Sequence, residues 1–152
     1  MKSDYKEFQI GKVLFALVLP VQILIAYYFI SKMGDHPLPI TGLVVSNSIF
    51  ILIYLLFYGM TTIISDDRIT VLYGIGLIRK RIHIDKILSV QSVENSWYNG
   101  LGIRMISNGV LYNIDGKHAV ELKFKHTNKV IRIGTKNSTQ LKRKIIKRIK
   151  AG

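Results

Sequence analysis

Two long apolar stretches dominate the first half of the chain. The stretch Val13–Ile30 and the stretch Leu43–Ile64 contain no Asp, Glu, Lys or Arg. About 20 apolar residues in a helix span the hydrocarbon core of a bilayer, which is roughly 30 Å thick. Buried core helices are the alternative, but helices that are apolar all round need more surrounding protein than this chain offers. The pattern therefore predicts two transmembrane helices, over about residues 13–31 and 40–65.

The segment between the two predicted helices is short and rich in turn formers. It contains Gly34, Pro37 and Pro39, which predicts a tight turn and an antiparallel hairpin. Lys and Arg concentrate on the cytoplasmic side of membrane spans. The turn carries Lys32, whereas more basic residues flank the outer ends of the hairpin, namely Lys2, Lys6, Lys12, Arg68, Arg79, Lys80 and Arg81. This distribution predicts a multi-pass protein of the cell membrane with cytoplasmic N- and C-termini.

Two amide side chains lie inside the predicted spans. Gln22 and Asn47 are placed at similar distances from the turn. In an antiparallel hairpin we expect them to face each other and share a hydrogen bond worth roughly 0.6–2 kcal/mol. The alternative, a polar path for transport, needs ionisable groups that the spans lack.

The pattern changes at Asp66 from continuous apolar residues to short alternating runs. Alternation with turn punctuation predicts seven antiparallel strands, over residues 68–73, 77–84, 87–94, 101–106, 110–114, 118–125 and 129–134. In the sixth of these, Val120, Leu122 and Phe124 are expected to point inward and Glu121 outward. The sequence thus divides into a cytoplasmic segment (1–12), a membrane hairpin (13–65) and a mainly-β cytoplasmic domain (66–152).

A helix is predicted at the end of the chain, from about residue 138 to residue 150. Asn137 is a candidate N-cap, with Gln140 three residues on. At 100° per residue the apolar residues share one arc, namely Leu141, Ile145, Ile146 and Ile149. We expect this arc to cover an open end of the small sheet domain.

Several short motifs of the domain resemble the bacterial PH-like domain of small membrane proteins. They are IDKI at 84–87, YNGLGIR at 98–104, GVLYNIDG at 109–116 and IRIGT at 131–135. The resemblance covers residues 66–146 and implies a PH-like fold of seven strands with a capping helix, preceded by one or two membrane helices. It implies no agreed catalytic residues. Some relatives are similar to self-immunity proteins against membrane-active bacteriocins.

The sequence contains little that points to catalysis. The absence of Cys excludes a disulfide scaffold and a cysteine enzyme. The stretch Gly74–Arg79 begins like a dinucleotide-binding fingerprint, but Arg79 replaces its last glycine and no helix pattern follows. The four histidines are scattered, without an adjoining acidic cluster. We therefore expect no catalytic residues, no metal site and no cofactor.

Charge is the clearest functional signal in the sequence. The chain has 22 Lys and Arg against 9 Asp and Glu, for a net charge of +13. Basic residues near a membrane attract anionic headgroups by about 1 kcal/mol each, although a merely solvated face is the alternative. Nucleic acid would also suit the charge, but the membrane tether disfavours it. The candidate contacts are Arg79, Lys80, Arg81, Lys142, Arg143, Lys144, Lys147, Arg148 and Lys150.

Two functional hypotheses follow. The first is a non-catalytic interaction module that binds anionic lipid or a membrane protein partner at the inner leaflet. The second is self-protection against a membrane-active bacteriocin or antimicrobial peptide, since a small, strongly cationic membrane protein suits repelling or sequestering a cationic peptide at the bilayer.

Overall fold

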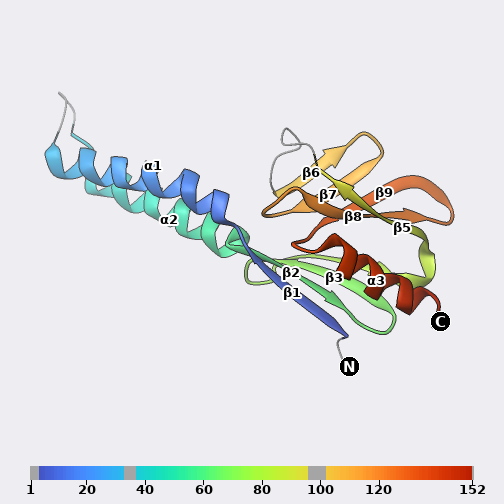
Figure 1. Ribbon diagram of the computed structural model, residues 1–152. Helices are drawn as coiled ribbons and strands as arrows, with labels where there is room; N and C mark the ends of the chain where they lie inside the picture. The colour runs from blue at the N-terminus through green and yellow to red at the C-terminus, as the bar shows by residue number, and fades with distance from the viewer. Residues whose placement is uncertain (1–3, 33–36, 96–101, 152) are drawn as a thin grey trace.

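The computed structural model describes residues 4–32, 37–95 and 102–151. Within these ranges a helical hairpin extends from one end of a domain built of two sheets and a C-terminal helix (Figure 1). Parts of the predicted hairpin turn (33–36) and of the YNGLGIR motif (98–101) lie outside the described residues. The elements are β1 Tyr5–Ile10, α1 Lys12–Ser31, α2 Ile40–Phe57, β2 Gly59–Ile64, β3 Arg68–Tyr73, β4 Ile78–His83, the 3-10 turn η1 Ile84–Lys86, β5 Ile87–Glu94, β6 Gly102–Ile106, β7 Gly109–Asn113, β8 His118–Phe124, β9 Thr127–Gly134 and α3 Ser138–Ile149.

The hairpin has the dimensions and the composition of a membrane-spanning unit. Both α1 and α2 are long and apolar enough to cross a bilayer, and none of their residues is buried inside the protein. The shorter helix, α2, has 18 residues, which at 1.5 Å per residue give about 27 Å of length. Apolar helices whose residues are not buried inside the protein are suited to a lipid environment.

The second helix is shorter than the sequence predicts. It ends at Phe57, whereas the apolar run continues to Ile64 as strand β2. Met60 and Ile64 of β2 are fully buried in the domain core. A buried strand and a buried helix are both continuous apolar runs, so periodicity alone does not separate them. The prediction of helix to residue 65 is therefore wrong at its end.

The N-terminal segment is also part of the domain. Strand β1 pairs with β2 in antiparallel register, from Tyr5 opposite Ile64 to Ile10 opposite Gly59. With β1 and β2 the described part of the chain has nine strands, and the seven predicted ones correspond to β3–β9. The hairpin is thus an insertion between two neighbouring strands, and the β-domain includes residues on both sides of it.

Two sheets enclose the core. In the described residues their strand orders are β1-β2-β3-β4 and β5-β8-β9-β7-β6. All described pairs are antiparallel except β7 with β9, which is parallel, so the expectation of a wholly antiparallel domain is wrong for this pair. The predicted terminal helix is confirmed: α3 packs on β5 and β8 with Leu141 and Ile145 fully buried. The Asn137 side chain accepts a hydrogen bond from the Gln140 backbone N–H at 2.9 Å.

The predicted contact between Gln22 and Asn47 does not form. Gln22 Oε1 instead accepts from the Tyr54 hydroxyl at 2.8 Å, and Asn47 Nδ2 donates to the Leu43 carbonyl of its own helix at 2.9 Å. Helical side chains lean toward the N-terminus of their helix. In an antiparallel hairpin, the side chains of two residues at the same depth therefore point in opposite directions along the helices. Tyr54 lies closer to the β-domain than Gln22, so the side chains of these two residues point toward each other.

Candidate binding surfaces

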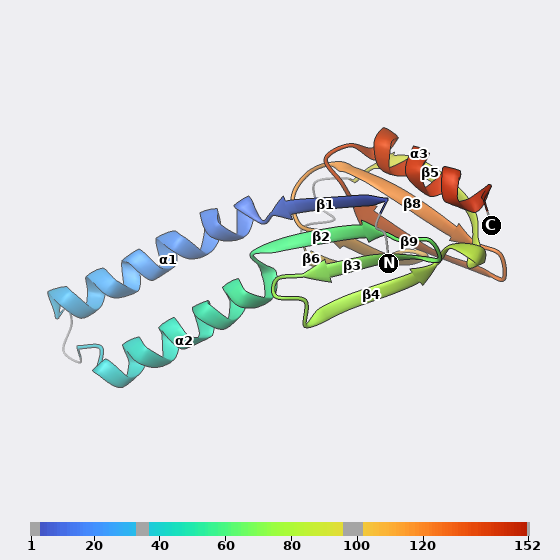
Figure 2. The same ribbon diagram turned by 90° about the horizontal axis from the view of Figure 1, so that it is seen from below.

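One end of the β-domain adjoins the apolar helical hairpin directly. The Gly11 N–H, at the entry to α1, donates to the Tyr58 carbonyl at 2.9 Å. The turn between β3 and β4 reaches the same level, because Gly74 N–H donates to the Gly59 carbonyl at 2.8 Å. Figure 2 shows this turn beside the end of α2. We call this end of the domain its membrane-side end, and the opposite end, with the β2–β3 turn, its far end.

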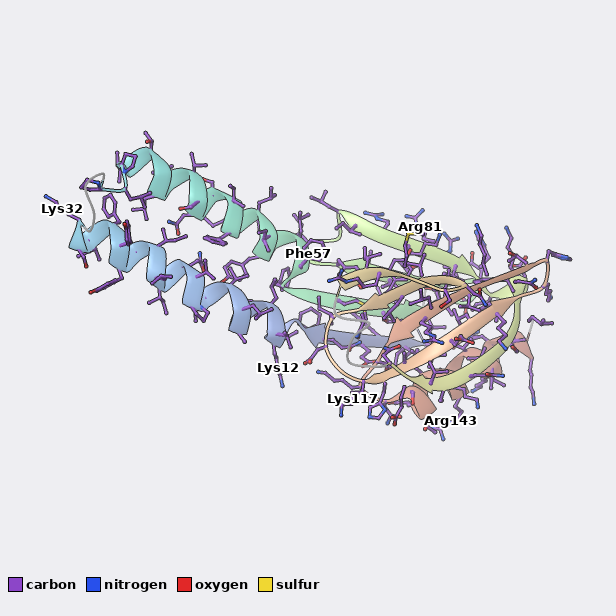
Figure 3. The ribbon with its side chains drawn as sticks, turned by 90° about the horizontal axis from the view of Figure 1, so that it is seen from above. Lys12, Lys32, Phe57, Arg81, Lys117 and Arg143 are labelled. Carbon is purple, nitrogen blue, oxygen red and sulfur yellow. The ribbon has the colours of Figure 1, made fainter. Side chains whose placement is uncertain are left out.

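The connection between β7 and β8 also lies at the membrane-side end. A Cβ atom on Gly11 would come within 3.2 Å of Ile114 Cγ1. Lys117 follows three residues later and lies at the same end of the molecule as Lys12, far from Lys32 at the tip of the hairpin (Figure 3). Both Lys12 and Lys117 are exposed.

The basic residues of β4 lie at increasing distances from the helical hairpin. Arg79 pairs with Leu72, next to the β3–β4 turn, whereas Arg81 pairs with Thr70 further along the strand. Arg79, Lys80 and Arg81 are all exposed. Arg79 is thus the member of this predicted group that is nearest to the hairpin. We name Lys12, Arg79 and Lys117 the membrane-side cations.

The basic residues of α3 belong to another region. The helix runs toward the far end, where Arg148 forms ion pairs with Asp4 and Asp66, the second at 3.0 Å. The partner Asp4 directly precedes β1, which is the edge of its sheet opposite to β4. The nine predicted contact residues therefore do not form one surface. On α3, Arg143, Lys147 and Lys150 are exposed, Lys142, Lys144 and Arg148 are half-buried, and Arg148 serves a structural ion-pair network.

A partly buried group of polar hydrogen bonds connects β1 to the rest of the domain. The Tyr5 hydroxyl and the Thr135 hydroxyl each donate to Glu7 Oε2 at 2.6 Å, and the Lys136 N–H donates to Glu7 Oε1 at 2.7 Å. Burial, together with the Glu7 carboxylate, raises the pKa of Tyr5 above its usual value. Gln9, fully buried, donates to the Gly134 carbonyl at 3.0 Å. The strand that leads into α1 is thus bonded to the β9–α3 connection.

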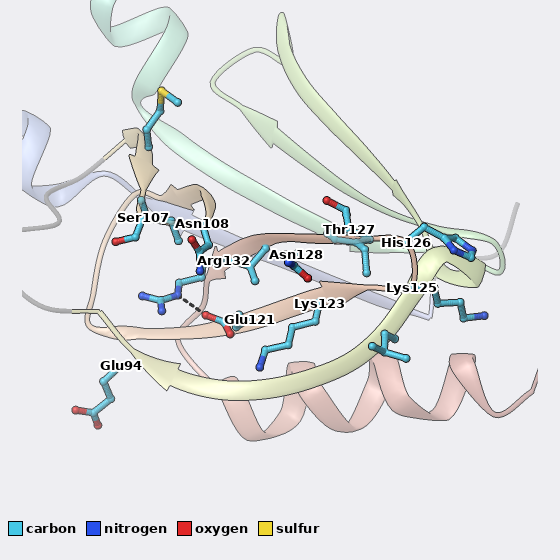
Figure 4. Close-up of a pocket in the computed structure, with 15 residues that line it drawn as sticks. Glu94, Ser107, Asn108, Glu121, Lys123, Lys125, His126, Thr127, Asn128 and Arg132 are labelled. Carbon is cyan, nitrogen blue, oxygen red and sulfur yellow. Dashed lines mark hydrogen bonds and ion pairs between the residues drawn. The ribbon is translucent and has the colours of Figure 1, made fainter.

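A wide polar cleft occupies the outer face of the second sheet (Figure 4). Its volume is about 1210 Å³. Glu121 of β8 and Arg132 of β9 form an ion pair across its floor at 2.8 Å. Glu121 points outward from the core, as the sequence predicts. It is nevertheless buried, because the neighbouring residues that line the cleft surround its side chain. Further lining residues include Glu94, Ser107, Asn108, Lys123, His126 and Asn128.

The chemistry of the cleft favours polar contacts. The Glu121–Arg132 ion pair carries no net charge. The described part of the lining also contains Lys123 and Lys125 against the single further carboxylate of Glu94, so the cleft keeps an excess of positive charge. Within residues 4–32, 37–95 and 102–151, no three His, Asp or Glu side chains gather in a way that could hold a metal ion.

The sequence did not indicate every residue of these surfaces. Lys117 stands alone in the sequence after the Asp115–Gly116 turn, and only the fold brings it to the same end of the domain as Lys12. The cleft joins residues of β5, β6, β8 and β9, so no local motif marks it. Comparison with known proteins finds no matching family model, no matching curated protein and no matching solved structure.

Proposed function

We propose that the chain is a non-catalytic, membrane-anchored binding module whose domain contacts anionic headgroups at the inner leaflet. The observation that carries this proposal is the insertion of the hairpin between β1 and β2. Ile10 and Gly59 are paired in the sheet, and α1 begins at Lys12. No free linker separates the domain from the bilayer, so the membrane-side end is held at headgroup level.

The membrane-side cations supply the attraction. Lys12, Arg79 and Lys117 are exposed, and each basic residue near an anionic surface is worth about 1 kcal/mol. The exposed basic residues of α3, Arg143, Lys147 and Lys150, lie on a helix that runs toward the far end of the domain, where they are available to a protein partner. The cytoplasmic placement of the domain is supported by the excess of basic residues at the outer ends of the hairpin.

We also propose that the domain is PH-like. Two packed sheets with a C-terminal helix whose apolar side is buried support this assignment. The first strand of such a domain would then precede the membrane hairpin. A fragment of residues 66–152 would lack β1 and β2, so binding must be measured on the full chain.

Lipid selectivity tests the proposed function. The full chain is reconstituted in phosphatidylcholine vesicles with a trace of spin-labelled phosphatidylglycerol or phosphatidylcholine, and electron paramagnetic resonance gives the protein-associated fraction of each label. Replacing the three membrane-side cations (Lys12→Gln, Arg79→Gln, Lys117→Gln) is expected to lower the preference for phosphatidylglycerol several-fold. Each lost cation is worth about 1 kcal/mol, and 1.4 kcal/mol corresponds to a tenfold change in the preference.

The matched control removes the same charge from the exposed residues of α3, by Arg143→Gln, Lys147→Gln and Lys150→Gln. This triple variant is expected to keep the wild-type preference, because these residues lie away from the bilayer. An equal loss in both triple variants, or no loss in the first, would reject the membrane-side cations as the headgroup contact.

A further inference from the structure

The turn between β3 and β4 is packed against the transmembrane helix α2. The Ile75 N–H donates to the Leu55 carbonyl at 3.1 Å. Gly74 lies so close to α2 that a Cβ atom there would overlap the Leu55 carbonyl oxygen and come within 2.6 Å of the Leu56 carbonyl carbon. The turn therefore reaches beyond the end of the helix at Phe57 and lies beside its last turn.

This contact has a physical reason in an apolar environment. The last carbonyl groups of a helix have no partner within the helix, and in lipid an unpaired carbonyl is costly. Leu55 belongs to the apolar span, and the turn supplies a donor to its carbonyl. The backbone of the turn is thus at the depth of the end of the span.

The turn carries large apolar side chains that the protein does not cover. Ile75 is 56% exposed and Leu77 is 71% exposed. The space around Gly76 between them is open, since a Cβ there would meet nothing within 4 Å. Turns in water usually carry polar residues, whereas this turn is beside the bilayer. We propose that the β3–β4 turn inserts Ile75 and Leu77 into the interfacial layer of the membrane, as a third contact beside the two helices.

Arg79 follows the inserted turn and complements it. Its Nη2 donates to the Gly76 carbonyl at 3.5 Å, which holds the side chain over the turn. A long basic side chain can lay its methylene groups along apolar surface while its charge remains among the headgroups. The inference rests on the membrane placement in the proposed function, but it does not require a preference for anionic lipid.

The absence of cysteine from the chain permits a direct test. Single-cysteine variants Ile75→Cys and Leu77→Cys of the full chain carry the fluorophore NBD in phosphatidylcholine nanodiscs, where both faces are open to water. The control is Leu88→Cys. Leu88 is 62% exposed and lies near the start of β5, at the far end of the domain. The rate of reduction by aqueous dithionite measures access to water.

Labels at positions 75 and 77 are expected to react several-fold more slowly than the label at position 88, and to be quenched by lipids that carry a spin label near the headgroup. Reduction of all three labels at one rate, without quenching, would overturn the insertion. Because the lipid is neutral, this result is independent of the charge selectivity of the membrane-side cations.

Discussion

Replacing Gly74 with alanine is expected to destabilise the protein by several kcal/mol. Gly74 has φ +51°, a conformation that costs a residue with a side chain about 1–3 kcal/mol. Its new methyl group would also overlap backbone atoms of Leu55 and Leu56, which cannot move without disturbing α2. Overpacking of this kind typically adds about 1–3 kcal/mol. Chemical denaturation of the full chain in detergent micelles measures the loss.

Gly76 provides the matched control within the same turn. Its φ is +89°, also in the left-handed region, but a Cβ there would meet no atom within 4 Å. Gly76→Ala therefore carries the conformational cost without the overlap, and the difference between the two variants reports the contact of the turn with α2. Equal destabilisation by both variants would show that the turn does not pack against the helix.

Ile145→Ala is expected to have the second large effect. Ile145 is fully buried and belongs to the core cluster with Leu141. Truncating a buried isoleucine to alanine costs about 2–5 kcal/mol, because the lost transfer free energy adds to the cost of the cavity. The same denaturation measurement therefore gives a clearly lower free energy of unfolding.

Lys147→Ala serves as the control on the same helix. Lys147 is exposed, so its truncation is expected to change the free energy of unfolding by no more than about 0.5 kcal/mol. If α3 were instead a tail adsorbed on the membrane, Ile145→Ala would leave the unfolding transition unchanged. That result would remove α3 from the core.

The two apolar helices and the strands after residue 66 could be predicted, because their patterns are local. Strand β1 could not be predicted from its own pattern. Its polar Gln9 points inward and is fully buried, while Phe8 and Ile10 are among the exposed apolar residues. This is the reverse of an ordinary half-buried strand. The burial of Gln9 is stabilised by its hydrogen bond to the Gly134 carbonyl. Because Gly134 is far from Gln9 in the sequence, the local sequence pattern does not indicate this partner.

The candidate sites were predictable only in part, for a related reason. The charge of Arg79 predicted a surface residue, but its distance from the hairpin depends on the register of β4 with β3. Arg148 belonged to the same basic pattern in the sequence, yet it pairs with Asp4 and Asp66. Composition identifies which residues are charged. The partner of each charge depends on the tertiary fold.

We propose that the hairpin crosses the membrane and holds the β-domain on its cytoplasmic side. The most direct measurement is labelling of single-cysteine variants in intact cells with a maleimide that does not cross membranes. Lys32→Cys probes the tip of the hairpin, and Ser107→Cys probes the exposed β6–β7 turn of the domain. We predict that Lys32→Cys is labelled in intact cells, whereas Ser107→Cys is labelled only after the membrane is permeabilised. Labelling of Ser107→Cys in intact cells, with Lys32→Cys protected, would contradict the account.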